Sequence, residues 1–239
     1  MQKRRQTSQV VAVVAIFAAL NVVSDSLASL PVFPSGVWYS WNFLMSPLTG
    51  VALGHSMGSL ASFIGVMIGH YIYFIDVYEF LFTLGAPIGV AMSALIFRGR
   101  TKPVLAYYSF LFAAYFATSE VWQLPVWGMW DTYVAFALLL ATVILVRKGV
   151  WNYRSRLPVS LAVSAFIGLE ADVLFRIFLF IPCQTYRLFY TFDVGALIVI
   201  WTSGAIVTPV EVLLSTMTTV LIGGPVVRFL RKEHTWLSH

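Results

Sequence analysis

The sequence predicts an all-α membrane protein, a bundle of transmembrane helices that forms one domain over residues 1–239. Hydrophobic residues make up 59% of the chain and charged residues only 10%, whereas a soluble domain has roughly 25% charged residues. Residues 133–146 and 194–209 contain no charged residue, and residues 10–30 contain only Asp25. Because a spanning helix needs about 20 largely apolar residues, we expect a multi-pass protein of the cell membrane.

Basic residues fall in four clusters, which predict the orientation of the chain. All but two of the 15 Lys and Arg residues lie in residues 3–5, 98–102, 147–156 and 228–232. Such clusters remain on the cytoplasmic side of a membrane. Residues 1–9 and 228–239 are therefore predicted to be cytoplasmic terminal segments. Topology thus accounts for the net charge of +5, so we expect the lipid bilayer, and not nucleic acid, as the surroundings of the chain.

If the four clusters share one side, each interval between them holds an even number of crossings. In the first interval, residues 10–30 and 80–97 predict two helices. Residues 42–74 lie between them and are interrupted by Pro47 and several glycines. Two short helices that meet near residues 55–58 satisfy the even count, so we predict a glycine-rich hairpin.

The later intervals give the remaining spans. Residues 104–122 and 132–146 predict two crossings in the second interval. The third interval contains residues 157–181, 194–209 and 210–227, which is one segment too many. We expect residues 194–208 to be the partial segment, because Thr208-Pro209 weakens it. The prediction is six to eight full spans plus one partial or re-entrant segment, with the lower counts if the hairpin is shallow.

Acidic and tryptophan residues gather at the ends opposite the basic clusters. The acids are Asp25, Asp76, Glu79, Glu120, Asp131, Asp193 and Glu211, and the tryptophans are Trp38, Trp41, Trp122, Trp127 and Trp130. An aromatic belt with charge asymmetry accounts for this pattern. An outward mouth lined by acids and aromatic faces also accounts for it, and would favour a cationic or planar ligand.

Three ionisable residues fall inside one predicted span, and such residues often mark a functional site. Asp172 and Arg176 are four positions apart, so they share a helix face and can pair. Glu170 has no evident partner in its own helix, so it either faces a cavity or remains protonated by burial. A structural polar network between helices is the alternative.

Other polar pairs are weaker signals. Asn21 and Asp25 share a helix face and can line a cavity or bond a neighbouring helix. His55 and His70 lack the further ligands that a metal site needs. The chain has one cysteine, Cys183, and no phosphate-binding loop of the Walker type. We therefore expect no metal, no cofactor and no ATP hydrolysis on this chain, and no enzymatic activity.

Several motifs resemble the substrate-binding (S) component of energy-coupling factor transporters. The first helix carries an Ala-xxx-Ala pattern at Ala15 and Ala19 after a short basic segment. Residues 46–54 and 58–65 are similar to the glycine-rich second and third helices of that family. Residues 82–89, with the basic exit at Arg98, look like its fourth helix, and residues 209–227 with their basic tail look like its last.

The resemblance implies a function and partners. An S component captures a vitamin-like small molecule at its outer side and docks on a transmembrane coupling protein driven by two ATPase subunits. Ala15 and Ala19 would face the coupling protein, and residues 33–41 would cover the substrate. The family typically has six helices, so the pair at residues 104–146 is a departure and would be an insertion.

Seven residues are the predicted substrate contacts. Trp41 and Trp122 would stack on a planar ligand whose edge Asn42 would bond. The charged candidates are Glu79, Glu120, Glu170 and Arg176. A stand-alone transporter coupled to protons or sodium is the first alternative, with Glu170 as proton carrier. A membrane-embedded enzyme and a structural subunit of a larger complex are the others.

Overall fold

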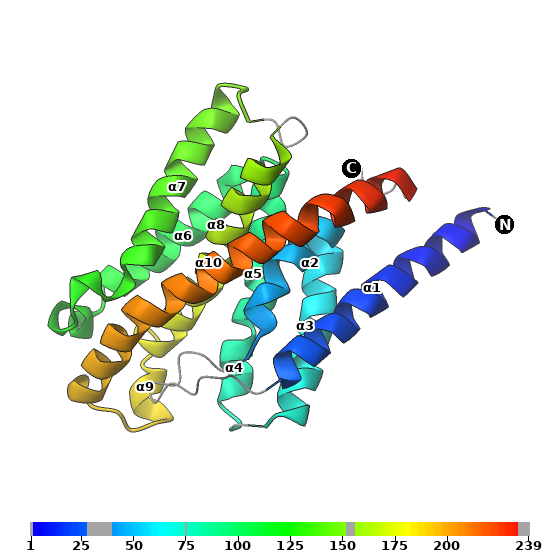
Figure 1. Cartoon of the computed structure of the whole chain (residues 1–239). Helices are drawn as coiled ribbons and strands as arrows, with labels where there is room; N and C mark the ends of the chain where they lie inside the picture. Colours follow the sequence, from blue (N-terminus) through cyan, green and yellow to red (C-terminus); the bar gives the residue numbers. More distant parts are fainter. Residues whose placement is uncertain (1, 28–39, 75, 152–155, 234–239) are drawn as a thin grey trace.

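The computed structural model describes residues 2–27, 40–74, 76–151 and 156–233, and its regular structure is helical (Figure 1). No strand occurs in these ranges, which confirms the predicted all-α class. The long helices are α1 (Gln2–Ser26), α3 (His55–Ile72), α5 (Gly85–Phe97), α6 (Thr101–Phe116), α7 (Trp130–Arg147), α8 (Leu157–Phe180) and α10 (Val194–Glu233). The short ones are η1 (Asn42–Leu44), α2 (Ser46–Leu53), α4 (Glu79–Thr83), η2 (Ser119–Gln123), η3 (Val126–Met129) and α9 (Thr185–Leu188).

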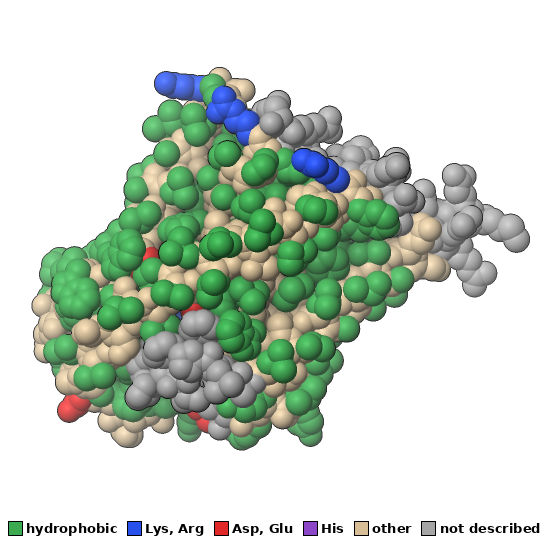
Figure 2. Space-filling view, in the orientation of Figure 1, with side chains coloured by type: hydrophobic (Ala, Val, Ile, Leu, Met, Phe, Trp, Pro, Cys, Tyr) green, Lys and Arg blue, Asp and Glu red, His purple; other side chains and the backbone are tan. Residues whose placement is uncertain are grey.

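Within the described residues, four helical stretches are long and apolar enough to cross a membrane. They are Ser8–Ser26, Glu79–Phe97, Val126–Arg147 and Val194–Leu230. Their outer faces carry large exposed apolar side chains, such as Val11 and Ile206, and much of the surface in Figure 2 is hydrophobic. Exposed apolar area on this scale is typical of a protein that faces lipid.

The glycine-rich hairpin forms from α2 and α3. Gly54 separates the two helices with φ 86° and ψ 175°, a backbone region that is essentially restricted to glycine. The chain reverses at Gly54, just before the predicted meeting point at residues 55–58. Helix α2 has only eight residues, and with η1 it forms the shorter apolar segment Asn42–Leu53.

The predicted partial segment at residues 194–208 does not exist as a separate element, and that prediction is wrong. Helix α10 continues through Pro209 for 40 residues, which is about 60 Å at 1.5 Å per residue. Figure 1 shows α10 running obliquely across the molecule. A proline removes one backbone donor, and in an apolar bundle neighbouring groups can satisfy the carbonyl that is freed. Residues 194–227 therefore lie in one continuous helix.

Helices α5 and α8 form the central pair of the bundle, and other helices pack around them. Helix α8 lies against α5 on one side and against α7 and α10 on others. The pair at residues 104–146 is part of this core, because Tyr107 and Tyr108 on α6 donate hydrogen bonds of 2.8 and 2.6 Å to the carbonyls of Ala171 and Ile167 on α8. Helix α1 lies along one edge and packs mainly on α3 (Figure 1).

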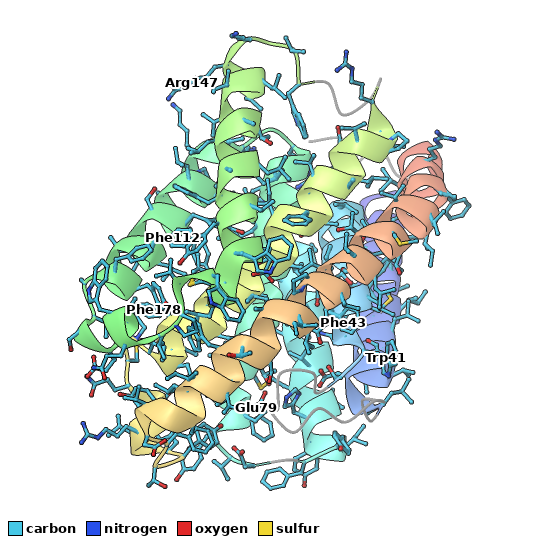
Figure 3. The ribbon with its side chains drawn as sticks, turned by 60° about the vertical axis from the view of Figure 1, so that its left-hand side comes forward. Trp41, Phe43, Glu79, Phe112, Arg147 and Phe178 are labelled. Carbon is cyan, nitrogen blue, oxygen red and sulfur yellow. The ribbon has the colours of Figure 1, made fainter. Side chains whose placement is uncertain are left out.

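Charge separates along the bundle. On the face in Figure 2, Lys and Arg side chains gather at the upper end, and the visible acidic side chains lie lower. The N-terminal part of α1, the C-terminal part of α10 and the C-terminal end of α7 lie toward the upper part of Figure 1. In Figure 3, Arg147 is at that end, whereas Trp41 and Glu79 lie in the opposite half. The bundle therefore has a basic end and an opposite end that contains the site described next.

Candidate functional site

A cavity of about 380 Å³ lies between the helices in the half opposite the basic end. Its lining comes from α1, η1, η3, α3, α4, α5, α7, α8 and α10, from Ser40, and from the segment that follows α9. Pockets for small molecules range from roughly 300 to 1,000 Å³, so the cavity is large enough for a compact organic ligand. Residues as far apart in the sequence as Asp25 and Glu211 meet there.

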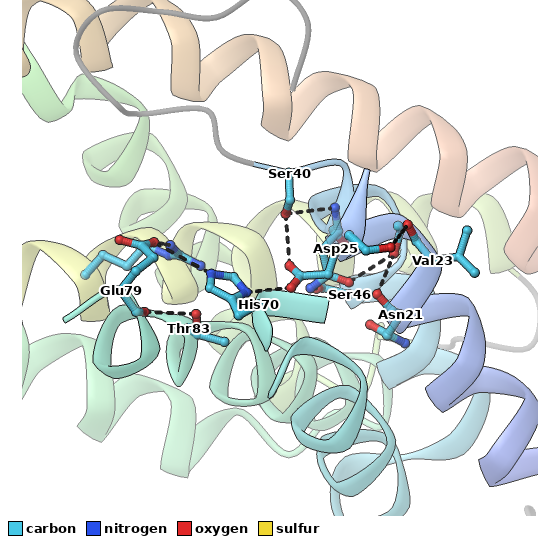
Figure 4. Close-up of polar contacts among 12 residues, drawn as sticks. Asn21, Val23, Asp25, Ser40, Ser46, His70, Glu79 and Thr83 are labelled. Carbon is cyan, nitrogen blue, oxygen red and sulfur yellow. Dashed lines mark hydrogen bonds and ion pairs between the residues drawn. The ribbon is translucent and has the colours of Figure 1, made fainter. Parts of the chain in front are cut away.

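A chain of charged contacts occupies one side of the cavity (Figure 4). His70 Nδ1 lies 2.5 Å from Asp25 Oδ2, and His70 Nε2 lies 4.0 Å from Glu79 Oε1. Arg176 continues the chain, with its NH1 nitrogen 3.7 Å from Glu79 Oε1. Its Nε is 2.7 Å from Asp172 Oδ1. The i,i+4 pair predicted from the sequence is thus present, and it belongs to a longer network.

The network joins four elements at the end of α1. Asp25 is in the last turn of α1, His70 in the last turn of α3, and Glu79 begins α4. Ser40 donates a hydrogen bond of 3.0 Å to Asp25 Oδ1, and the Trp41 amide donates one of 3.1 Å to the Ser24 carbonyl. Residues 40 and 41 therefore pack against the end of α1 on this side of the cavity.

A second group of acids lies on α7, α8 and α10. Asp131 accepts hydrogen bonds from the Thr132 amide, at 3.0 Å, and from the Thr208 hydroxyl. The Thr132 hydroxyl donates to Glu170 Oε2 at 2.8 Å. Trp130 Nε1 donates to the Ala205 carbonyl at 2.9 Å and so fixes α7 against α10. The partners of these carboxylates are neutral donors, in contrast to the first group.

Aromatic and aliphatic side chains complete the lining. Trp201 on α10 stacks on Tyr115, with ring centroids 6.3 Å apart and an interplanar angle of 3°. Phe180 on α8 contacts Tyr190 and Phe192 from the α9–α10 connection. Apolar walls with a few fixed polar groups are typical of small-molecule sites.

The predicted contacts divide into residues inside and outside the cavity. Asn42, Glu79 and Arg176 line it. Glu170 is completely buried behind it, where Thr132 connects it to Asp131. Trp41 is not part of the lining and lies against Phe43, with ring centroids 5.9 Å apart.

Glu120 and Trp122 lie elsewhere. Both are in η2, between α6 and α7, and neither belongs to the cavity lining. Glu120 accepts a hydrogen bond of 2.8 Å from Ser119, and Trp122 is 69% exposed. Neither of the two tryptophans predicted to stack on a ligand, Trp41 and Trp122, therefore lines this cavity. Of the predicted cover at residues 33–41, the part up to residue 39 lies outside the described residues.

Sequence reasoning did not select Asp25, His70, Asp131 or Glu211 as ligand contacts, although all line the cavity. The common position of acids near one end of the helices was the available signal. Asn21 and Asp25 take different roles. Asn21 donates a hydrogen bond of 3.1 Å to Thr49 on α2, whereas Asp25 faces the cavity.

No cluster suited to a metal ion occurs among the described residues, where groups of three or more His, Cys, Asp or Glu side chains were sought. Searches of protein-family models, curated proteins and solved structures found no match to this chain. The function is therefore argued from the cavity and its surroundings.

Proposed function

We propose that this chain is the substrate-capturing membrane subunit of an importer of the energy-coupling factor type. It binds a vitamin-like small molecule in the cavity and passes it on through a coupling protein driven by two ATPase subunits. The observation that carries the proposal is the cavity itself, which combines about 380 Å³ of space with fixed polar groups and aromatic walls. The cavity lies opposite the basic end of the bundle, so the positive-inside rule directs it outward.

The surface of α1 supports the partner contact. Phe17 and Ala18 are buried in the bundle, whereas Ala15 and Ala19 are exposed on the same helix. Small residues allow the backbone of a second helix to approach closely in lipid. On this proposal, Ala15 and Ala19 contact the coupling protein, and both termini are cytoplasmic.

The test begins with mass spectrometry of small molecules released from the detergent-purified protein. We expect one compound in a near-stoichiometric amount. Gly204 lines the cavity, and a side chain added there would meet nothing within 4 Å. Gly204→Phe should therefore fill the cavity and remove the compound.

Gly224→Phe is the matched control. Gly224 is on the same helix and also has nothing within 4 Å of an added Cβ, but it is not part of the lining. This variant should retain the compound. Protein that is folded but empty, and that binds none of the candidate vitamins added back, would contradict the proposal.

A stand-alone proton-coupled transporter is the second candidate, and Glu170 is the observation that favours it. Glu170 is fully buried and its Oε1 has no hydrogen-bond partner in the described part of the chain. A carboxyl group in such a place can carry a proton. This candidate requires uptake into proteoliposomes that contain only this chain, driven by a pH gradient and lost in Glu170→Gln. The first proposal requires no uptake without the partners.

A further inference from the structure

The charges that line the cavity are unbalanced. Its acidic residues are Asp25, Glu79, Asp131, Asp172 and Glu211, and its potentially cationic residues are His70 and Arg176. Even with a protonated histidine, the carboxylates outnumber the cations. Carboxylates in a site of low dielectric need a positive partner or several hydrogen bonds. The positions of the two cations therefore determine which carboxylates lack a positive partner.

Both cations form their ion pairs on the same side of the cavity. His70 contacts Asp25 at 2.5 Å and Arg176 contacts Asp172 at 2.7 Å, and both approach Glu79 at 4.0 and 3.7 Å. Every ion pair found among the described residues belongs to this network. The carboxylates that remain are on α7 and α10.

On that opposite side, Asp131 has hydroxyl and amide donors and a side-chain contact with Glu170, but no cationic partner at ion-pair distance. Glu211 lines the cavity and makes no hydrogen bond or ion pair with any described residue. Glu170 Oε1 and the indole Nε1 of Trp201 are buried on this side without a hydrogen-bond partner among the described residues, as are His70 Nε2 and Glu79 Oε1 on the other side. Trp201 is 95% buried and is itself part of the lining. Buried polar groups are rarely left unpaired unless something else binds them.

The surroundings of this acidic side indicate an organic partner. Trp201 is on α10, as are Thr208 and Glu211, and an aromatic face attracts a cation that lies over it. Phe192 and Ile200 supply apolar surface in the same lining. The described residues hold no three-ligand cluster for a metal ion. An apolar body that carries one positive group fits this lining better than a bare ion.

We infer that the ligand is a small organic cation, a protonated amine or a charged nitrogen heterocycle, whose positive group lies against Asp131 and Glu211 beside Trp201. This inference rests on the proposed function, because it names the class of the captured molecule. The His70–Arg176 network on the other side already has two cationic side chains for its three carboxylates, counting His70 as protonated, so it faces the uncharged end of the ligand.

The test uses purified wild-type protein and two matched sets of probes. One set is tryptamine, tryptophol and indole-3-acetate, and the other is phenethylamine, phenethyl alcohol and phenylacetate. Within each set the aromatic body is constant and the charge changes from positive to neutral to negative. Thermal stabilisation should need at least 10-fold less amine than alcohol, and the carboxylates should not stabilise.

Variants assign the effect to the two acids. Asp131→Asn and Glu211→Gln should each weaken amine binding roughly 10- to 100-fold, the expected effect of losing a charged hydrogen bond. Glu211 makes no hydrogen bond or close ion pair with a described residue and interacts with Arg176 only at longer range, so its variant should fold normally. Asp193→Asn is the control, because Asp193 is exposed and caps α10 through the Ala196 amide at 2.8 Å, a role that asparagine can also fill.

The outcomes separate the inference from the proposed function. Three results would overturn the inference alone. They are alcohols or carboxylates that bind as well as or better than the amines, a released compound without positive charge, and unchanged amine binding in both variants. Stabilisation by NaCl over KCl that Glu211→Gln removes would assign the acids to an inorganic cation, and so would also overturn it. No binding by any probe together with no released compound would count against the proposed function as well.

Discussion

Arg176 joins two carboxylates of different elements in the cavity wall. It contacts Asp172 one turn earlier on α8 and approaches Glu79 on α4. The sequence predicted the first contact, because an i,i+4 spacing depends only on helix geometry. The contact between His70 and Asp25, which are 45 positions apart, could not be predicted, because it depends on how α1 packs on α3.

Replacing Arg176 tests whether this network stabilises the fold. Arg176→Met should lower the thermal midpoint of the detergent-solubilised protein, because Asp172 and Glu79 lose their cation in a largely buried site. Adding Asp172→Asn should restore part of the loss, since one of the stranded charges is then gone. The midpoints of the two single variants and the double variant form a cycle that measures the coupling. Strictly additive effects of the two substitutions would show that the pair contributes nothing specific.

At the scale of helices, the sequence predicted most elements, and its error concerned α10. Residues 157–181 and 132–146 correspond closely to α8 and α7. Thr208-Pro209 looked like a boundary, yet α10 passes through it. Local propensity is a weak guide there, because packing of Trp130 and Asp131 against α10 fixes the residues around the proline. The hairpin was easier to predict, since a run of glycines is a local signal.

The contact between α5 and α8 depends on close backbone approach. A Cβ built on Gly168 would lie 2.9 Å from the Gly89 carbonyl oxygen and closer still to the Ser93 side chain. Gly168→Ala should therefore destabilise the protein by about 1–3 kcal/mol, the usual cost of overpacking. Thermal unfolding measures this effect.

Gly224→Ala is the comparison, because its added Cβ would meet nothing within 4 Å and alanine favours a helix by roughly 0.5–1 kcal/mol. An unaltered midpoint in Gly168→Ala would mean that α5 and α8 can separate without cost.

For the whole molecule, the cavity could not be located from the sequence. The acids that line it are on α1, α4, α7, α8 and α10. In the sequence, each one is simply an acidic residue near the end of a helix and does not by itself indicate a site. Their convergence is a property of the bundle, because α7 and α10 are held together by the Trp130 bond to Ala205. The pair at residues 104–146 therefore contributes to the candidate site, through Asp131 and Thr132. The charge asymmetry was predictable, since it is a matter of counting residues at helix ends.

The native cysteine offers a direct test of orientation. Cys183 is exposed in the α8–α9 connection, near the cavity end of the bundle, whereas Lys148 follows α7 at the basic end. A membrane-impermeant maleimide should label Cys183 from outside in spheroplasts. It should label Lys148→Cys, made in a Cys183→Ser background, only in inverted vesicles.

The labelling pH matters. Although Cys183 is exposed, its thiol is partly covered by protein, and this partial burial raises the pKa of the thiol. A raised pKa leaves less of the reactive thiolate at neutral pH, so the rate at Cys183 should increase as the pH rises from about 7 toward 9. The rate at the exposed position 148 should approach its plateau at lower pH. Labelling of both positions from the same side would refute the even number of passes between residue 148 and the C-terminal basic cluster, because α8 then would not cross. Labelling of each position from the side opposite to that expected would instead invert the whole bundle and turn the cavity toward the cytoplasm, which would contradict capture of a ligand from outside.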